Sequence, residues 1–171
     1  MVARRVQAEL ATSGLSCEVL RYDAINPGPL AAPATPFTQI YYFATPRIRP
    51  DAASDEGVRA EYQAVYSQGQ HRLLAALKGA LADHAALYYP STVFTEQPDS
   101  GFAAYAKAKL DGEDAAREAA RAHGLGVVVQ RLPRLRTGQS AALLGDDALE
   151  TLPVMLETVR QVTRHQKEMH S

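Results

Sequence analysis

Two kinds of apolar pattern alternate along this chain. Short apolar runs predict strands, and they lie at 17–22, 39–44, 86–91 and 127–129. Longer stretches carry an apolar residue at every third or fourth position, which predicts amphipathic helices at 4–13, 56–81 and 101–123. A last helix is expected from Asp146 or Thr151 onward. Four prolines between residues 24 and 38 exclude a regular helix there.

Capping residues support the boundaries of the helix at 101–123. Asp99 or Ser100 stands where an N-cap belongs, and Gly124 follows the last helical turn. Gly69 interrupts the preceding helical stretch. The pattern therefore predicts one long, well-capped helix between two buried strands.

Strands separated by helices predict an α/β fold with a parallel sheet covered on both faces. Ligands of such sheets bind beyond the carboxyl ends of the strands. Asp23, Ala44, Ser91 and Pro133 each lie at the carboxyl end of a predicted strand. We therefore expect these four residues to line one crevice.

Composition narrows the class of protein. The chain has 171 residues, 46% hydrophobic and 22% charged, with a net charge of -1, which predicts one globular domain over residues 1–171. No basic excess indicates a nucleic-acid surface. Cys17 is the single cysteine, so no internal disulfide is possible, and the histidines form no metal-ligand pattern. No apolar run reaches membrane-spanning length and no signal core follows Met1, so we expect a cytoplasmic protein without a membrane partner.

The candidate chemistry lies in the helix at 101–123 and the strand before it. Tyr105 and Lys109 stand four residues apart and share a helix face. An ammonium beside a phenol favours the phenolate, so Lys109 is expected to lower the pKa of Tyr105 and to fit it for acid–base work. Ser91 or Thr92 ends the strand and could donate a hydrogen bond to a substrate oxygen. Spacing does not choose between the two hydroxyls.

These residues, in this order and at this spacing, resemble the short-chain dehydrogenase/reductase family. The family has a serine, a Tyr-x-x-x-Lys pair and a Pro-Gly-x-x-x-Thr element, and here Arg134 replaces the glycine of the last one. The resemblance implies a Rossmann-like three-layer α/β/α fold and an oxidoreductase acting on a small carbonyl or alcohol. It makes Tyr105 the acid/base, Lys109 its pKa tuner and Ser91 or Thr92 the substrate-oxygen donor.

The resemblance also implies a cofactor, NAD(P), with NADP favoured. The residues that it assigns to cofactor binding are Asp23, Ala44, Lys109, Pro133 and Thr137. The family's glycine-rich turn, which receives the pyrophosphate, has no counterpart ahead of the first predicted helix. By this match the fold is incomplete, and its first strands and glycine-rich loop are absent.

Two roles remain open for a chain with these departures. Tyr66 stands where the family has a helical asparagine, and Tyr42 to Thr45 replace its Asn-Asn-Ala-Gly turn. The chain is therefore either an oxidoreductase or a noncatalytic, truncated member that pairs with an intact reductase. The family often dimerises through the helices corresponding to 56–81 and 101–123, so a dimer is expected in both cases.

Overall fold

A three-stranded parallel sheet forms the centre of the molecule. The computed structural model describes residues 2–50, 54–97, 101–133, 135–136 and 149–168. The strands lie in the order β1 (Phe37–Tyr41), β2 (Leu81–Thr92) and β3 (Gly126–Leu132). Tyr88 of β2 pairs with Tyr41 on one side and Val128 on the other, so β2 is the central strand.

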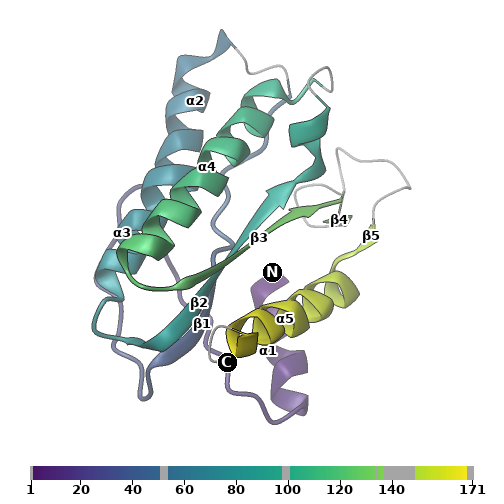
Figure 1. Ribbon diagram of the computed structural model, residues 1–171. Coiled ribbons are helices and arrows are strands. Elements are labelled where there is room, and N and C mark those ends of the chain that lie inside the picture. Colours follow the sequence, from purple (N-terminus) through teal and green to yellow (C-terminus); the bar gives the residue numbers. More distant parts are fainter. Residues whose placement is uncertain (1, 51–53, 98–100, 134, 137–148, 169–171) are drawn as a thin grey trace.

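Helices cover both faces of this sheet (Figure 1). One face carries α2 (Glu56–Gln63), a π-helical turn η2 (Ala64–Gln68), α3 (Gly69–Ala76) and α4 (Ala103–Ala122). The other face carries α1 (Val2–Thr12) and α5 (Thr151–Glu168). The remaining short elements are η3 (Val93–Glu96), β4 (Leu135–Arg136) and β5 (Leu149–Glu150). The predicted α/β class, with a Rossmann-like parallel sheet between helices, is confirmed.

The apolar run of β2 is continuous because both of its faces are buried. Leu87 and Tyr89 pack in the core beneath α3 and α4. Ala86 and Tyr88 point the other way, where they meet Val162 of α5. Successive side chains of a strand alternate between faces, so a strand between two helical layers needs an apolar residue at every position.

The strand predicted at 17–22 is wrong. These residues have no regular secondary structure, and no backbone hydrogen bond joins them to the sheet. Side-chain hydrogen bonds hold the end of this segment against the helical layer instead: the Tyr22 hydroxyl donates to the Gly69 carbonyl at 2.7 Å, and the Arg72 guanidinium donates to the Ala24 carbonyl. Side-chain hydrogen bonds to the helical layer therefore hold this segment, in place of the backbone hydrogen bonds expected of a strand.

Gly69 does not break the helical stretch but allows its close packing. A Cβ at this position would collide with the Tyr42 hydroxyl and lie 2.9 Å from the Ala24 Cβ. The same Tyr42 hydroxyl donates to the Val65 carbonyl at 2.6 Å, inside η2. A π-turn leaves a carbonyl without its usual helical partner, and here the side chain of Tyr42, the residue after β1, donates a hydrogen bond to it.

Helix ends differ from the predictions by a few residues. The stretch predicted to reach residue 81 ends at Ala76, and α4 begins after Phe102, which makes no side-chain cap. The cap candidates Asp99, Ser100 and Asp146 lie outside the described residues. Gly124, with φ +68°, follows α4 as predicted. Among the described residues, no helix combines the length and hydropathy that a membrane span requires.

Candidate active site

The Lys109 amine is buried at the carboxyl end of β2. It lies 4.4 Å from the ring centroid of Tyr66 and 4.4 Å from that of Tyr89, and it donates a hydrogen bond to the Pro90 carbonyl. Burial lowers the pKa of Lys109 to about 7, against the opposing influence of the Glu113 carboxylate. An amine with this pKa is partly neutral near pH 7, which suits a group that exchanges protons.

Tyr105 lies one helical turn before Lys109 but is not paired with it. Its ring packs edge to face against Tyr62, Tyr66 and Phe94. Burial raises the pKa of Tyr105 to about 12, and a hydrogen bond with the Thr92 side chain lowers it only in part. The expectation that Lys109 lowers the pKa of Tyr105 is therefore wrong for this structure, because the ammonium lies over other rings and desolvation dominates.

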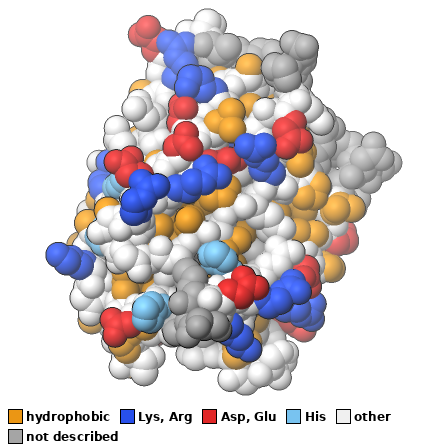
Figure 2. Space-filling model, in the orientation of Figure 1, with side chains coloured by type: hydrophobic (Ala, Val, Ile, Leu, Met, Phe, Trp, Pro, Cys, Tyr) orange, Lys and Arg blue, Asp and Glu red, His pale blue; other side chains and the backbone are white. Residues whose placement is uncertain are grey.

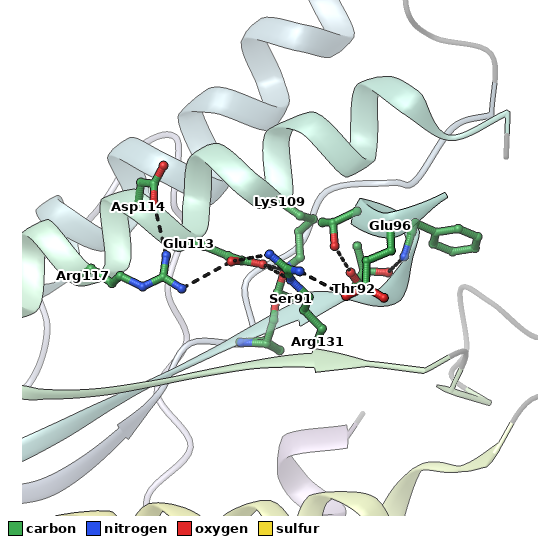
Figure 3. Close-up of polar contacts among 11 residues, drawn as sticks. Ser91, Thr92, Glu96, Lys109, Glu113, Asp114, Arg117 and Arg131 are labelled. Atoms are coloured by element: carbon green, nitrogen blue, oxygen red, sulfur yellow. Dashed lines mark hydrogen bonds and ion pairs between the residues drawn. The ribbon is translucent and has the colours of Figure 1, made fainter. Parts of the chain in front are cut away.

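The two candidate hydroxyls have different partners. Ser91 donates to Oε1 of Glu113 at 2.6 Å, whereas Thr92 meets Tyr105 and accepts from the backbone N–H of Phe94 at 3.3 Å. Figure 3 shows Ser91 and Glu113 facing each other between β2 and α4. Of the two, Thr92 is therefore the hydroxyl that lies beside the phenol.

A second set of charges surrounds Glu113. Arg131 of β3 donates from Nε to Oε1 at 3.0 Å and from a terminal nitrogen to Oε2 at 3.2 Å, and it also reaches Glu96 at 3.1 Å (Figure 3). Arg117 lies 3.4 Å from Oε2. The hydrogen bonds from Arg131, Ser91 and Arg117 hold the pKa of Glu113 below its usual value, against the opposing effect of burial. We call Ser91, Thr92, Tyr105, Lys109 and Glu113 the β2–α4 cluster.

An open crevice of about 730 Å³ lies beyond the carboxyl end of β1. Its lining includes two predicted cofactor residues, Asp23 and Ala44, together with Thr45 and Val65. The Asp23 carboxylate accepts from the backbone N–H groups of the second and third residues after it, at 2.9 and 3.0 Å, so it also closes a turn. The crevice thus joins two of the predicted site residues.

The crevice does not extend to the remaining predicted residues. Ser91 and Pro133 are not among the residues that line it, so the expectation of one crevice lined by all four strand ends is wrong. Pro133 is exposed after β3, and Thr137 lies outside the described residues. One contact connects the crevice to the cluster: the hydroxyls of Thr45 and Tyr66 are 2.7 Å apart.

Sequence reasoning missed Glu113 and the contacts of Tyr66 and Tyr89 with the Lys109 amine. Glu113 could have been found, because it stands four residues after Lys109 on the same helix face. Tyr89 carried no such signal, and Tyr66 was noted only because it stands where the family has a helical asparagine. They come from β2 and η2, and only the packing of these elements against α4 brings their rings to the amine.

Solved structures resemble this arrangement over most of the chain. The protein lin1944 from Listeria innocua superposes with a TM-score of 0.66 at 14% identity, covering 94% of this chain and 88% of its own. A short chain dehydrogenase from Salmonella enterica serovar Typhi gives 0.61 at 18% identity, covering 94% of this chain and 62% of its own. This chain has a Rossmann-like parallel α/β fold that resembles part of these structures.

A third structure carries a nucleotide. A short chain dehydrogenase from Burkholderia cenocepacia, in complex with NADP, gives a TM-score of 0.54 at 13% identity and covers 78% of this chain and 56% of its own. This chain therefore spans about three fifths of the length of the two dehydrogenases. No family model matches the chain, and no curated protein matches it significantly.

Proposed function

We propose that this chain is an oxidoreductase of the short-chain dehydrogenase type, which interconverts a small carbonyl compound and its alcohol with NAD(P), NADP being favoured. The observation that carries the proposal is the buried amine of Lys109, which donates a hydrogen bond to the Pro90 carbonyl, directly before Ser91 and Thr92, at the carboxyl end of the central strand. In an α/β sheet this end is where ligands bind. Tyr105 lies one helical turn before Lys109 on α4.

The protonation states support a division of roles. Tyr105, with a pKa raised to about 12, holds its proton at neutral pH and would act as the acid in carbonyl reduction. The proton would pass from the phenol to the substrate oxygen, while Thr92 donates or accepts a hydrogen bond at that oxygen. Lys109, with a pKa of about 7, could then return a proton to the phenolate. The cofactor, when bound, supplies or accepts the hydride.

The crevice suits one part of such a cofactor. Its volume and its position beyond β1, with Asp23, Ala44 and Thr45 in the wall, fit a nucleoside. The chain contains no glycine-rich turn of the dinucleotide-binding pattern for the pyrophosphate. Lys109, Pro133 and Thr137 stay as predicted contacts toward the nicotinamide side. The complex of the Burkholderia dehydrogenase with NADP supports the choice of nucleotide.

Titration of the purified protein with NADPH and with NADH, followed by fluorescence, tests this proposal. We expect micromolar binding of NADPH, about -8 kcal/mol, and turnover of some member of a carbonyl panel. Tyr105→Phe should bind the cofactor equally well and lose turnover by about 10²–10⁴-fold. Absence of binding up to millimolar concentrations would exclude autonomous catalysis.

The alternative is a noncatalytic subunit that pairs with an intact reductase. It is favoured by the burial of Tyr105 and Lys109, which are 9% and 5% exposed and line no part of the crevice. Figure 2 shows acidic and basic side chains interspersed over the side of the molecule that carries α2 and α4. Light scattering of the chain alone and mixed with an intact reductase would detect a dimer of either kind.

A further inference from the structure

Glu113 is a buried carboxylate whose oxygens are occupied by protein donors. It is 3% exposed, and its partners are the Ser91 hydroxyl and the guanidinium groups of Arg131 and Arg117. A buried charge is tolerated only when it is paired and hydrogen-bonded. The hydroxyl of Ser91 and the guanidinium groups of two arginines therefore all bind the one carboxylate of Glu113.

The hydrogen bond to Glu113 limits which group can receive the hydroxyl proton of Ser91. A serine hydroxyl has one proton to donate, and here that proton points to Oε1 of Glu113 at 2.6 Å. Ser91 cannot give the same proton to a substrate oxygen while the bond lasts. Thr92, the next residue, turns to Tyr105 instead.

The same carboxylate acts on Lys109. The two residues stand one helical turn apart on α4, and their partners, Pro90 and Ser91, are adjacent in β2. Two consecutive residues of the strand end are thus each held by a side chain of the helix. Around the amine, Tyr66 faces it from η2 and Tyr89 from β2, while Tyr105 and Glu113 lie one turn away on α4 itself.

We propose that Glu113, supported by Arg131, is a positioning residue of this site. Glu113 accepts a hydrogen bond from Ser91, so that the hydroxyl proton of Ser91 is not donated to a substrate. It also holds the end of β2 against α4 so that Thr92 lies beside Tyr105, and it supplies the negative charge beside Lys109. Its catalytic consequence rests on the proposed oxidoreductase function. Its structural consequence does not, and both can be measured.

The charge is tested by NMR titration of the protein labelled with ¹³C at the lysine side chains. The chain has four lysines, and loss of a signal in Lys109→Arg assigns the relevant one. Glu113→Gln should lower the pKa of Lys109 by about 1 unit, because an opposite charge one turn away is lost. Asp114→Asn is the matched control, since Asp114 also pairs with Arg117 but is exposed, and it should change nothing. An unchanged Lys109 titration in Glu113→Gln would overturn the proposal.

Arg131→Gln gives an independent result if Glu113→Gln does not fold. This variant keeps the Glu113 carboxylate but removes the positive charge of Arg131 that is paired with it. The negative charge felt by Lys109 is then larger, so the pKa of Lys109 should rise instead of fall. A shift of the same sign as in Glu113→Gln, or no shift, would contradict the assigned role.

The partition of hydroxyls is tested with Ser91→Ala and Thr92→Val. In protein labelled with ¹³C at the tyrosine Cζ, Thr92→Val should move the Tyr105 signal and Ser91→Ala should leave it nearly in place. If the protein turns over a carbonyl substrate, Thr92→Val should lower kcat, and Ser91→Ala should lower Tm with little change in kcat. The reverse pattern would refute the partition. If wild type has no activity, the proposed function fails while the NMR signals still decide the positioning.

Discussion

The β2–α4 cluster and the crevice beyond β1 differ in almost every physical respect. In the cluster, Lys109 and Glu113 are buried charges with close partners, and neither lines the crevice. The crevice has a volume of about 730 Å³ and is lined by a turn residue, Asp23, and by small side chains such as Ala44. The cluster contains the buried titratable groups, and the crevice contains the room for a ligand.

The comparison shows that a polar cluster requires close packing of its side chains, whereas a binding cavity requires that space be left open. The cluster reaches its geometry through close approach: a Cβ on Gly112 would collide with the Tyr89 hydroxyl and lie 2.7 Å from its ring carbon Cζ. The Tyr89 hydroxyl is buried without a hydrogen-bond partner among the described residues. Catalysis would require the two regions to act together through Thr45 and Tyr66.

Gly112→Ala should have the largest effect on stability. The new methyl group would have to displace Tyr89 or lie 2.9 Å from the Tyr66 carbonyl, so we expect a loss of about 3 kcal/mol. Chemical denaturation measures this loss. Gly57→Ala is the control, because Gly57 lies on the exposed side of α2 and meets only a side-chain oxygen, at 3.3 Å. Equal stability of Gly112→Ala and wild type would show that the cluster is loosely packed.

The buried amine of Lys109 should make stability depend on pH. Its pKa is lowered from 10.5 to about 7 on folding, so between these values the unfolded chain binds more protons than the folded one. Stability should therefore rise as the pH rises from 7 to 9.5, by up to about 1.4 kcal/mol per pH unit. Tm measured over this range should show the rise in wild type and a flatter profile in Lys109→Met. Parallel profiles would mean that the amine is hydrated.

The contact between the two regions can be removed by Thr45→Val or by Tyr66→Phe. Each variant deletes one hydroxyl of the 2.7 Å pair and keeps the shape of the side chain, so we expect a loss of about 1 kcal/mol. Thr45→Ser retains the hydroxyl and should lose less. In the double variant the losses should not add, since both substitutions delete the same bond. Additive losses would show that the two hydroxyls act separately.

Asp23→Asn should have the smallest effect on stability. An asparagine oxygen can still accept from the two backbone N–H groups of the turn, so the fold should be retained. Its effect on the dissociation constant of NADPH then reports whether this wall of the crevice meets the cofactor. An unchanged constant would restrict Asp23 to its role in the turn.

The local pattern was sufficient for the elements that are buried on both sides or capped. The run at 86–91 predicted the carboxyl-terminal half of β2, because the part of a strand that is buried between two helical layers is mainly apolar. Tyr105 and Lys109 were placed on one helix by their spacing alone. For the segment 17–22 the same reasoning gave a wrong prediction. The Tyr22 hydroxyl donates to the Gly69 carbonyl, and no periodicity within the segment indicates this contact.

By itself the sequence determined the α/β alternation, the helix that carries Tyr105 and Lys109, and the two hydroxyls that precede it. The tertiary structure decided which partner each hydroxyl contacts and how far the pKa of each titratable group is shifted. Hydrogen bonds between β2 and α4 separated Thr92 from Ser91, and burial moved the pKa of Tyr105 up and that of Lys109 down. These outcomes depend on the desolvation and the distances between groups far apart in the chain, and local patterns do not contain that information.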